Sequence, residues 1–204
     1  MESSAPRGYY RGLVLVVGCS DLVELYVVAQ KIGVNPVEML SVSLLVKEGL
    51  GRVAISKKLG LSERTVRNIL HALKASRATE VVLGVLHRLQ RRLLHAPWLT
   101  CSPVLYSGVG SDVTRVLLTH VVSARDYIVV YSGDPDKVEV VGVVESGRLE
   151  YPGIPQEIVG PYMELGNLVA TSSGVLVCWR NYVEHVDDAV LLVSLARLCA
   201  VSAV

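Results

Sequence analysis

The side chains with the clearest chemistry in this sequence are basic and lie between residues 52 and 95. This segment holds ten lysines and arginines against two glutamates. From residue 101 onward acidic side chains outnumber basic ones by twelve to six, although the whole chain has a formal net charge of only +1. Such segregation indicates that one part of the chain faces a polyanion and the other does not, as in nucleic-acid binders with an attached second domain.

A short pattern inside the basic segment indicates how a polyanion would be bound. Ser56, Gly60, Val66 and Ile69 have the spacing of the packing positions in a helix-turn-helix. A small side chain lets two helices approach, glycine permits the turn between them, and the aliphatic residues hold the second helix against the first. Ser62 has the position of an N-cap, and its hydroxyl could also donate to a phosphate. The pattern therefore predicts DNA binding.

The outward side chains of the second helix are the predicted contacts with DNA. The N-terminal residues of such a helix meet base edges in the major groove. Arginine suits guanine and asparagine suits adenine, so Arg64, Arg67 and Asn68 are predicted to read bases. The lysines nearby are predicted to contact phosphates. The complete predicted DNA-binding set is Arg52, Lys57, Lys58, Ser62, Arg64, Thr65, Arg67, Asn68, His71, Lys74 and Arg88.

The segment Leu50 to Lys74, LGRVAISKKLGLSERTVRNILHALK, resembles the winged helix-turn-helix of archaeal predicted transcriptional regulators that carry a C-terminal domain of unknown function. Ser56 departs from this pattern, because alanine is commoner there. Residues 145–155, ESGRLEYPGIP, are similar to the second part of these proteins. The resemblance implies a sequence-specific, double-stranded DNA-binding transcriptional regulator with a C-terminal sensing or dimerisation domain.

Caps and hydrophobic period predict the N-terminal elements. Asp21 is the predicted N-cap of the first helix, which ends near Gly33, and Asn35 caps the second, with Pro36 at its first helical position. Val53, Ile55 and Leu59 are the predicted buried positions of the third helix, and Val66, Ile69, Leu70 and Leu73 are those of the fourth. The predicted helices are residues 21–33, 35–48, 52–59 and 62–75, after a strand or irregular lead-in at 9–17.

Residues 79–95 are compatible with two structures. A wing would pair 79–82 with 85–89 through Gly84. A single amphipathic helix would instead place Arg88, Arg91, Arg92 and His95 on one face. The period favours the helix, at least for the second half, and the usual hairpin turn residues are missing. Such a helix could pair with its copy in a homodimer, which would suit a palindromic operator.

Short valine-rich runs separated by glycine turns follow Pro97 and predict a second domain. The predicted strands are 104–106, 127–131, 138–144, 148–151, 168–171 and 175–179, and the predicted helices are 112–124 and one that opens at Asp187 and Asp188. The predicted fold class is α+β overall. An N-terminal all-α (winged) helix-turn-helix domain at 1–96 precedes a small α/β domain at 97–204 with a mixed or antiparallel sheet.

One loop of the second domain could bind a ligand. Gly108, Gly110, Ser111 and Asp112 lie between a predicted strand and a predicted helix, where two glycines and a helix N-terminus could hold an anionic effector. The third glycine and the lysine of a phosphate-binding loop are missing, so an ordinary strand-to-helix turn is the alternative. Small-molecule or nucleotide binding by this loop, and protein docking by the helix-turn-helix, remain the alternative functions.

Neither an enzyme nor a metalloprotein is predicted. His120 and His185 lack metal-ligand spacing and a convincing nucleophile beside them, so no cofactor is expected. The four cysteines contain no Cys-x-x-Cys pair, which favours reduced, buried thiols in a cytoplasmic protein. The longest nearly uncharged run, 189–204, is interrupted by Arg197 and is too short to cross a bilayer, so no membrane partner is predicted.

Overall fold

The computed structural model describes residues 16–76 and 78–202, which form an α+β protein as predicted. The N-terminal helices are α1 (Cys19–Ile32), α2 (Pro36–Lys47), α3 (Arg52–Leu59), α4 (Glu63–Ala75) and α5 (Ala78–Arg88). The strands are β1 (Gln90–Leu93), β2 (Ser102–Ser107), β3 (Val138–Glu145), β4 (Arg148–Glu150) and β5 (Gly174–Trp179). The later helices are α6 (Ser111–Ser132), α7 (Gln156–Val159), the 3-10 helix η1 (Gly160–Tyr162), α8 (Leu165–Leu168) and α9 (Val186–Ser202).

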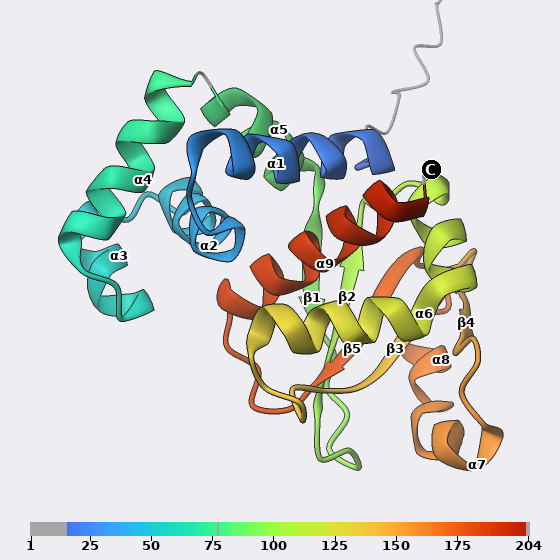
Figure 1. The fold of residues 1–204 in the computed structure, drawn as a ribbon. Helices are drawn as coiled ribbons and strands as arrows, with labels where there is room; N and C mark the ends of the chain where they lie inside the picture. Colours follow the sequence, from blue (N-terminus) through green and yellow to red (C-terminus); the bar gives the residue numbers. More distant parts are fainter. Residues whose placement is uncertain (1–15, 77, 203–204) are drawn as a thin grey trace, which may run out of the picture.

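The elements are arranged in layers. In Figure 1, α2, α3 and α4 form the left-hand end of the molecule, and the sheet lies on the right behind α6 and α9. Side chains alternate between the two faces of the sheet. Val104 and Tyr106 of β2 join the main core, whereas Leu105 faces a smaller cluster with Leu165 of α8. Both faces of the sheet are therefore covered.

The sheet is antiparallel, with the strand order β1-β2-β5-β3-β4. The predicted hairpin of β3 and β4 is confirmed, and its turn residues Ser146 and Gly147 have φ values of 50° and 81°. Two positive φ angles match the twist of a two-residue hairpin turn. The predicted strand at 168–171 is wrong, because β5 instead pairs with β2 and β3, and α8 ends at Leu168.

Helix α1 starts before the predicted cap. Asp21 is the third residue of the helix, and its carboxylate accepts from the N–H of Gly18 at 2.9 Å. The N–H of Cys19 donates to Asp112 at 2.7 Å. The prediction of Asp21 as the N-cap was wrong because the carboxylate that caps the helix belongs to Asp112, which is distant in sequence and gives no local signal. Only positions 16 and 17 of the predicted lead-in at 9–17 belong to the described residues, and Val17 forms a single parallel bridge with Val109.

Helices α2, α3 and α4 follow the predictions closely. The side chain of Asn35 accepts from the N–H groups of Val37 and Glu38, and Pro36 occupies the first turn of α2. Of the predicted buried positions in α3, Ile55 is fully buried, but Val53 is 46% exposed. The prediction for Val53 was wrong because α3 packs on the rest of the protein mainly through Ile55, its one buried residue.

Neither alternative for residues 79–95 is correct. Residues 78–88 form α5 in place of a wing hairpin, and residues 90–93 form β1 in place of the second half of a long helix. Strand β1 pairs with β2, with Arg91 opposite Tyr106. Tertiary pairing thus overrides the helical period. It also places β1 in the sheet of the second half, although the predicted domain boundary falls after residue 96.

The predicted strand at 127–131 is also wrong, because α6 continues through it. Val121, Ala124 and Ile128 are buried along one face of this helix, at spacings of three and four residues. The helix is interrupted only by a kink at His120, with φ −131° and ψ 35°. Among residues 16–76 and 78–202, no helix is both long and apolar enough to cross a membrane.

The two halves of the chain share one hydrophobic core. Leu25 of α1 and Met39 of α2 are buried in the same cluster as Leu192 and Ala196 of α9. Figure 1 shows α1 running alongside α9. Helices α1 and α2 therefore bury part of their apolar surface against α9, and removing α9 would expose it.

All four cysteines form disulfides, which corrects the prediction of free thiols. Cys19 of α1 is bonded to Cys199 of α9, and Cys101, next to β2, is bonded to Cys178 of β5. The partners are 180 and 77 residues apart in sequence, so no local spacing indicated the pairs. The prediction of a cytoplasmic protein, which relied on reduced thiols, loses that support.

Candidate functional site

The turn between α3 and α4 has the local geometry that the sequence predicts. Gly60 adopts the left-handed conformation, with φ 66°, and ends α3. The hydroxyl of Ser56 donates to the carbonyl of Leu61 at 2.6 Å. The hydroxyl of Ser62 accepts from the N–H of Thr65 at 3.0 Å, which confirms Ser62 as the N-cap of α4. The serine at position 56 thus fastens the turn by a bond that alanine could not make.

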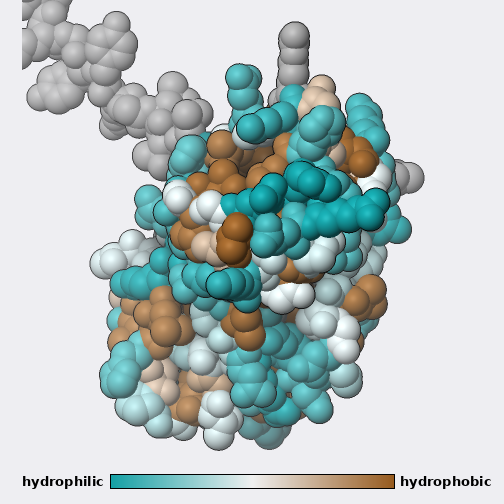
Figure 2. Space-filling model, turned by 90° about the vertical axis from the view of Figure 1, so that its left-hand side faces the viewer, coloured by the Kyte–Doolittle hydropathy of each residue, from teal (hydrophilic) through white to brown (hydrophobic). Residues whose placement is uncertain are grey.

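Helix α4 has its larger apolar residues on one face and its charged residues on the opposite face. Val66, Ile69 and Leu73 are buried, and Leu70 is half-buried. The exposed positions are the predicted outward ones, namely Glu63, Arg64, Arg67, Asn68, His71 and Lys74. Figure 2 turns this end of the molecule toward the viewer, and strongly hydrophilic side chains gather across the upper part of that face. The second helix of the motif therefore presents a continuous polar surface to solvent.

The surface of α3 and α4 is strongly basic. Its exposed basic residues are Arg52, Lys57, Lys58, Arg64, Arg67 and Lys74, and Glu63 is the acidic residue among them. Arg52 forms an ion pair with Glu63 at 3.3 Å, in which both side chains are about half exposed. Such surface pairs are weak, so this one leaves the face with a clear excess of positive charge.

Arg88, a predicted DNA contact, is engaged inside the protein. Its guanidinium donates to both carboxylate oxygens of Asp21 at 3.0 and 2.9 Å and to the carbonyl of Val16 at 2.9 Å. This bidentate contact lowers the pKa of Asp21 below its usual value. Arg88 therefore joins α5 to α1 and is not available to a phosphate.

The predicted ligand loop at 108–112 is filled by the chain itself. The carbonyl of Gly108 accepts from the N–H of Val17 at 2.7 Å, and the N–H of Gly110 donates to the carbonyl of Val17 at 2.8 Å. Asp112 caps α1 through the N–H of Cys19. The loop, which also contains Ser111, thus binds the segment before α1, and the ordinary strand-to-helix turn is the interpretation that fits this geometry.

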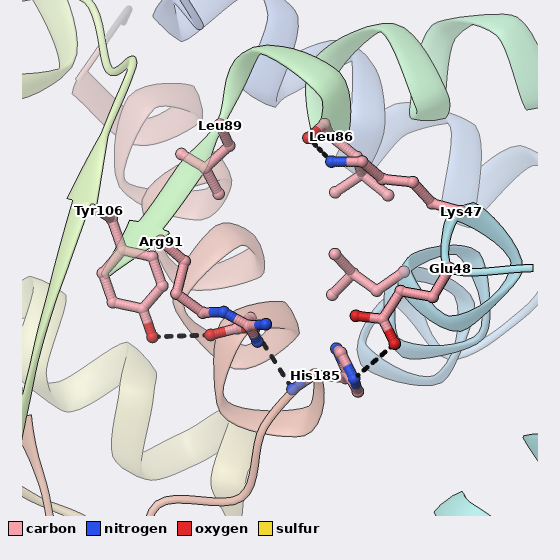
Figure 3. Close-up of a pocket in the computed structure, with 9 residues that line it drawn as sticks. Lys47, Glu48, Leu86, Leu89, Arg91, Tyr106 and His185 are labelled. Carbon is pink, nitrogen blue, oxygen red and sulfur yellow. Dashed lines mark hydrogen bonds and ion pairs between the residues drawn. The ribbon is translucent and has the colours of Figure 1, made fainter. Parts of the chain in front are cut away.

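A pocket that the sequence did not predict lies where α2 and α5 meet the sheet and the start of α9 (Figure 3). Its volume is about 190 Å³. One wall is a buried network centred on Asp188, which accepts from Arg91 at 2.6 Å, Tyr106 at 2.9 Å and Tyr182 at 2.7 Å. Burial raises the pKa of Tyr106 well above its usual value, so this hydroxyl stays a donor. The network fastens β1 and β2 to α9.

His185 forms the opposite side of this pocket. Its side chain is buried, and Nε2 lies 3.3 Å from Oε2 of Glu48 and 3.2 Å from Nζ of Lys58. Burial lowers the pKa of His185, so its neutral form is favoured. Lys58 was predicted to contact phosphate, but its ammonium is turned toward the second half of the chain. No pattern in the sequence indicated this cluster, because Lys58 and His185 are 127 residues apart.

No protein family, curated protein or solved structure that was compared with the chain matches it. The similarity of residues 50–74 to regulatory helix-turn-helix segments therefore stays a prediction from the sequence.

Proposed function

We propose that this chain is a sequence-specific, double-stranded DNA-binding transcriptional regulator that uses α4 as its recognition helix. The observation that carries the proposal is the exposed polar face of α4, which lies opposite a buried face formed by Val66, Ile69 and Leu73. The basic side chains of α3 and α4 add the charge that a phosphate backbone attracts. The second half of the chain would then serve as a sensing or dimerisation unit.

The exposed residues divide by their chemistry into two groups. Arg64, Arg67 and Asn68 lie in the first half of α4, and their side chains suit guanine and adenine edges. Lys57 and Lys74 suit phosphates, which fix the position of the protein without reading sequence. Loss of a base-reading side chain should change sequence preference, whereas loss of a phosphate contact should change mainly the dependence on salt.

The test is a DNA-binding titration with the full chain. A truncation after residue 95 would leave β1 without β2 and expose the faces of α1 and α2 that pack on α9. A sequence is first selected from random duplexes and then titrated at several salt concentrations. Arg67→Ala should weaken binding roughly 5- to 150-fold and change the selected bases. Lys74→Ala should reduce the slope of log affinity against log salt by about 1.

The matched control is Arg148→Ala, because Arg148 is 83% exposed on the hairpin of β3 and β4. It should bind DNA like the unmodified chain. The proposal fails if the full chain does not bind duplexes at low salt, or if Arg67→Ala and Arg148→Ala bind equally well. Absent DNA binding would favour the alternative of a protein-docking helix-turn-helix. Light scattering of the free and DNA-bound chain tests the homodimer that a palindromic operator would require.

A further inference from the structure

Three side chains with metal-binding groups converge beside the pocket of Figure 3. Glu48 follows the last residue of α2, and Glu184 and His185 precede α9. One ligand atom from each of the three lies within 4.8 Å of the other two. Figure 3 shows His185 and Glu48 facing each other from separate elements. The fold thus brings the carboxylate of Glu48 to a carboxylate and an imidazole that are adjacent to each other but far from it in sequence.

His185 is held in place through its backbone, and Nε2 is the ring nitrogen that faces Glu48, Glu184 and Lys58. Its backbone N–H donates to Asp188 at 3.3 Å, and its carbonyl accepts from Ser41 at 3.3 Å. The residue is 1% exposed, and Nδ1 is buried without a hydrogen-bond partner among the described residues. A neutral imidazole is the form that binds metals, and Nε2 is the ring nitrogen that lies near both glutamates.

The separations suit a first-row divalent cation. Zinc bonds to nitrogen and oxygen are about 2.0–2.2 Å long, so neighbouring ligands of a tetrahedral ion lie roughly 3.4 Å apart. Nε2 of His185 lies 3.3 Å from Oε2 of Glu48 and 4.0 Å from Oε2 of Glu184. Small side-chain rotations would therefore complete three ligands and leave a fourth position to water.

Two cationic groups already contact this cluster. Arg91 donates to Oε1 of Glu184, which leaves Oε2 of that carboxylate for an ion. The ammonium of Lys58 lies 3.2 Å from Nε2 of His185, on the nitrogen that would face the ion. An ammonium and a divalent cation cannot share the same lone pair, and they repel each other at short range. The two would compete for the cluster.

We propose that Glu48, Glu184 and His185 form a binding site for a divalent transition-metal cation of the Zn²⁺ class, in competition with the ammonium of Lys58. Cation binding would release Lys58, which lies on α3 within the basic face. If the proposed function holds, the released lysine adds a phosphate contact and steepens the salt dependence of DNA binding. Only this last consequence rests on the proposed function.

Calorimetric titration of the disulfide-bonded full chain with ZnCl₂ near neutral pH tests the site without DNA. The oxidised form is used because free thiolates bind zinc themselves. About one Zn²⁺ per chain should bind, and Co²⁺ in its place should give a visible spectrum of nitrogen and oxygen ligands. Substitution of buried His185 can unfold the chain, so the exposed Glu48 and Glu184 carry the test. Glu48→Gln and Glu184→Gln should each weaken binding by at least about tenfold, whereas the control Glu157→Gln on α7 should not.

The competition has its own readout. Lys58→Met should tighten Zn²⁺ binding by roughly fivefold or more, whereas the control Lys31→Met on α1 should not. The site is overturned if the unmodified chain shows no binding below about 1 mM Zn²⁺, or if both glutamine variants bind like it. Unchanged affinity in Lys58→Met overturns the competition. A chain that binds Zn²⁺ but no DNA keeps the site and refutes the proposed function.

Discussion

Replacing Asp188 by alanine should loosen the attachment of β1 and β2 to α9. The carboxylate of Asp188 is 4% exposed and accepts hydrogen bonds from Arg91, Tyr106 and Tyr182. The hydroxyl of Tyr106 in turn accepts from Nε1 of Trp179 at 3.1 Å. The substitution therefore leaves a buried tyrosine hydroxyl without its acceptor and removes one partner of a guanidinium.

The expected loss of stability follows from what stays unpaired. Breaking a buried ion pair by removing one partner typically costs about 3–5 kcal/mol. Arg91 is 29% exposed and keeps Glu184 as a second partner, so its charge is still partly compensated. We therefore expect a decrease of about 3 kcal/mol in the free energy of unfolding. For a chain of this length, that corresponds to a fall in melting temperature of roughly 6–12 °C.

The measurement is guanidinium chloride unfolding of the oxidised chain, followed by circular dichroism and tryptophan fluorescence. The matched control is Asp136→Ala, because the side chain of Asp136 is 80% exposed and lies 3.7 Å from Arg180. Such an exposed pair contributes less than about 1 kcal/mol. A folded Asp188→Ala chain that loses under about 1 kcal/mol, or no more than Asp136→Ala, would refute the assigned role of the network.

The other predictions concern an ion pair, a helix cap and the disulfides. The pKa of Asp21 is lowered by Arg88, so its contribution to stability is present above the pKa of the unfolded chain and is lost as pH falls through the lower folded value. Asp21→Asn should flatten that acid dependence in unfolding curves between about pH 5 and pH 2, and an unchanged dependence contradicts the assignment. Ser62→Ala removes the acceptor for the N–H of Thr65 and should lower the free energy of unfolding by about 1 kcal/mol, whereas Ser62→Gly should cost only a few tenths. Non-reducing peptide mapping should recover both disulfides, and their reduction should lower the free energy of unfolding by about 2–5 kcal/mol each; recovery of free thiols would contradict the pairing.

The local elements of the DNA-binding face could be predicted because their signals lie within a few residues of one another. Asn35 and Ser62 cap helices through N–H groups two or three positions away, and Gly60 adopts its turn conformation by itself. The apolar period of α4 also predicted which of its side chains are exposed. Such features depend on backbone geometry and hydrophobic burial along one helix, which sequence spacing reports directly.

The sequence by itself therefore determined the helix caps, the turn, the polar face of α4 and the basic charge beside it. Only the tertiary structure decided that residues 90–93 are a strand, because β1 forms by pairing with β2. Only the packing of α5 on α1 pairs Arg88 with Asp21 and so removes it from the predicted DNA contacts. Likewise, only the folded chain places the segment at Val17 in the loop at 108–112. The disulfides and the cluster around His185 join residues more than 70 positions apart. Contacts of that kind arise when elements pack, and no spacing along the chain encodes them.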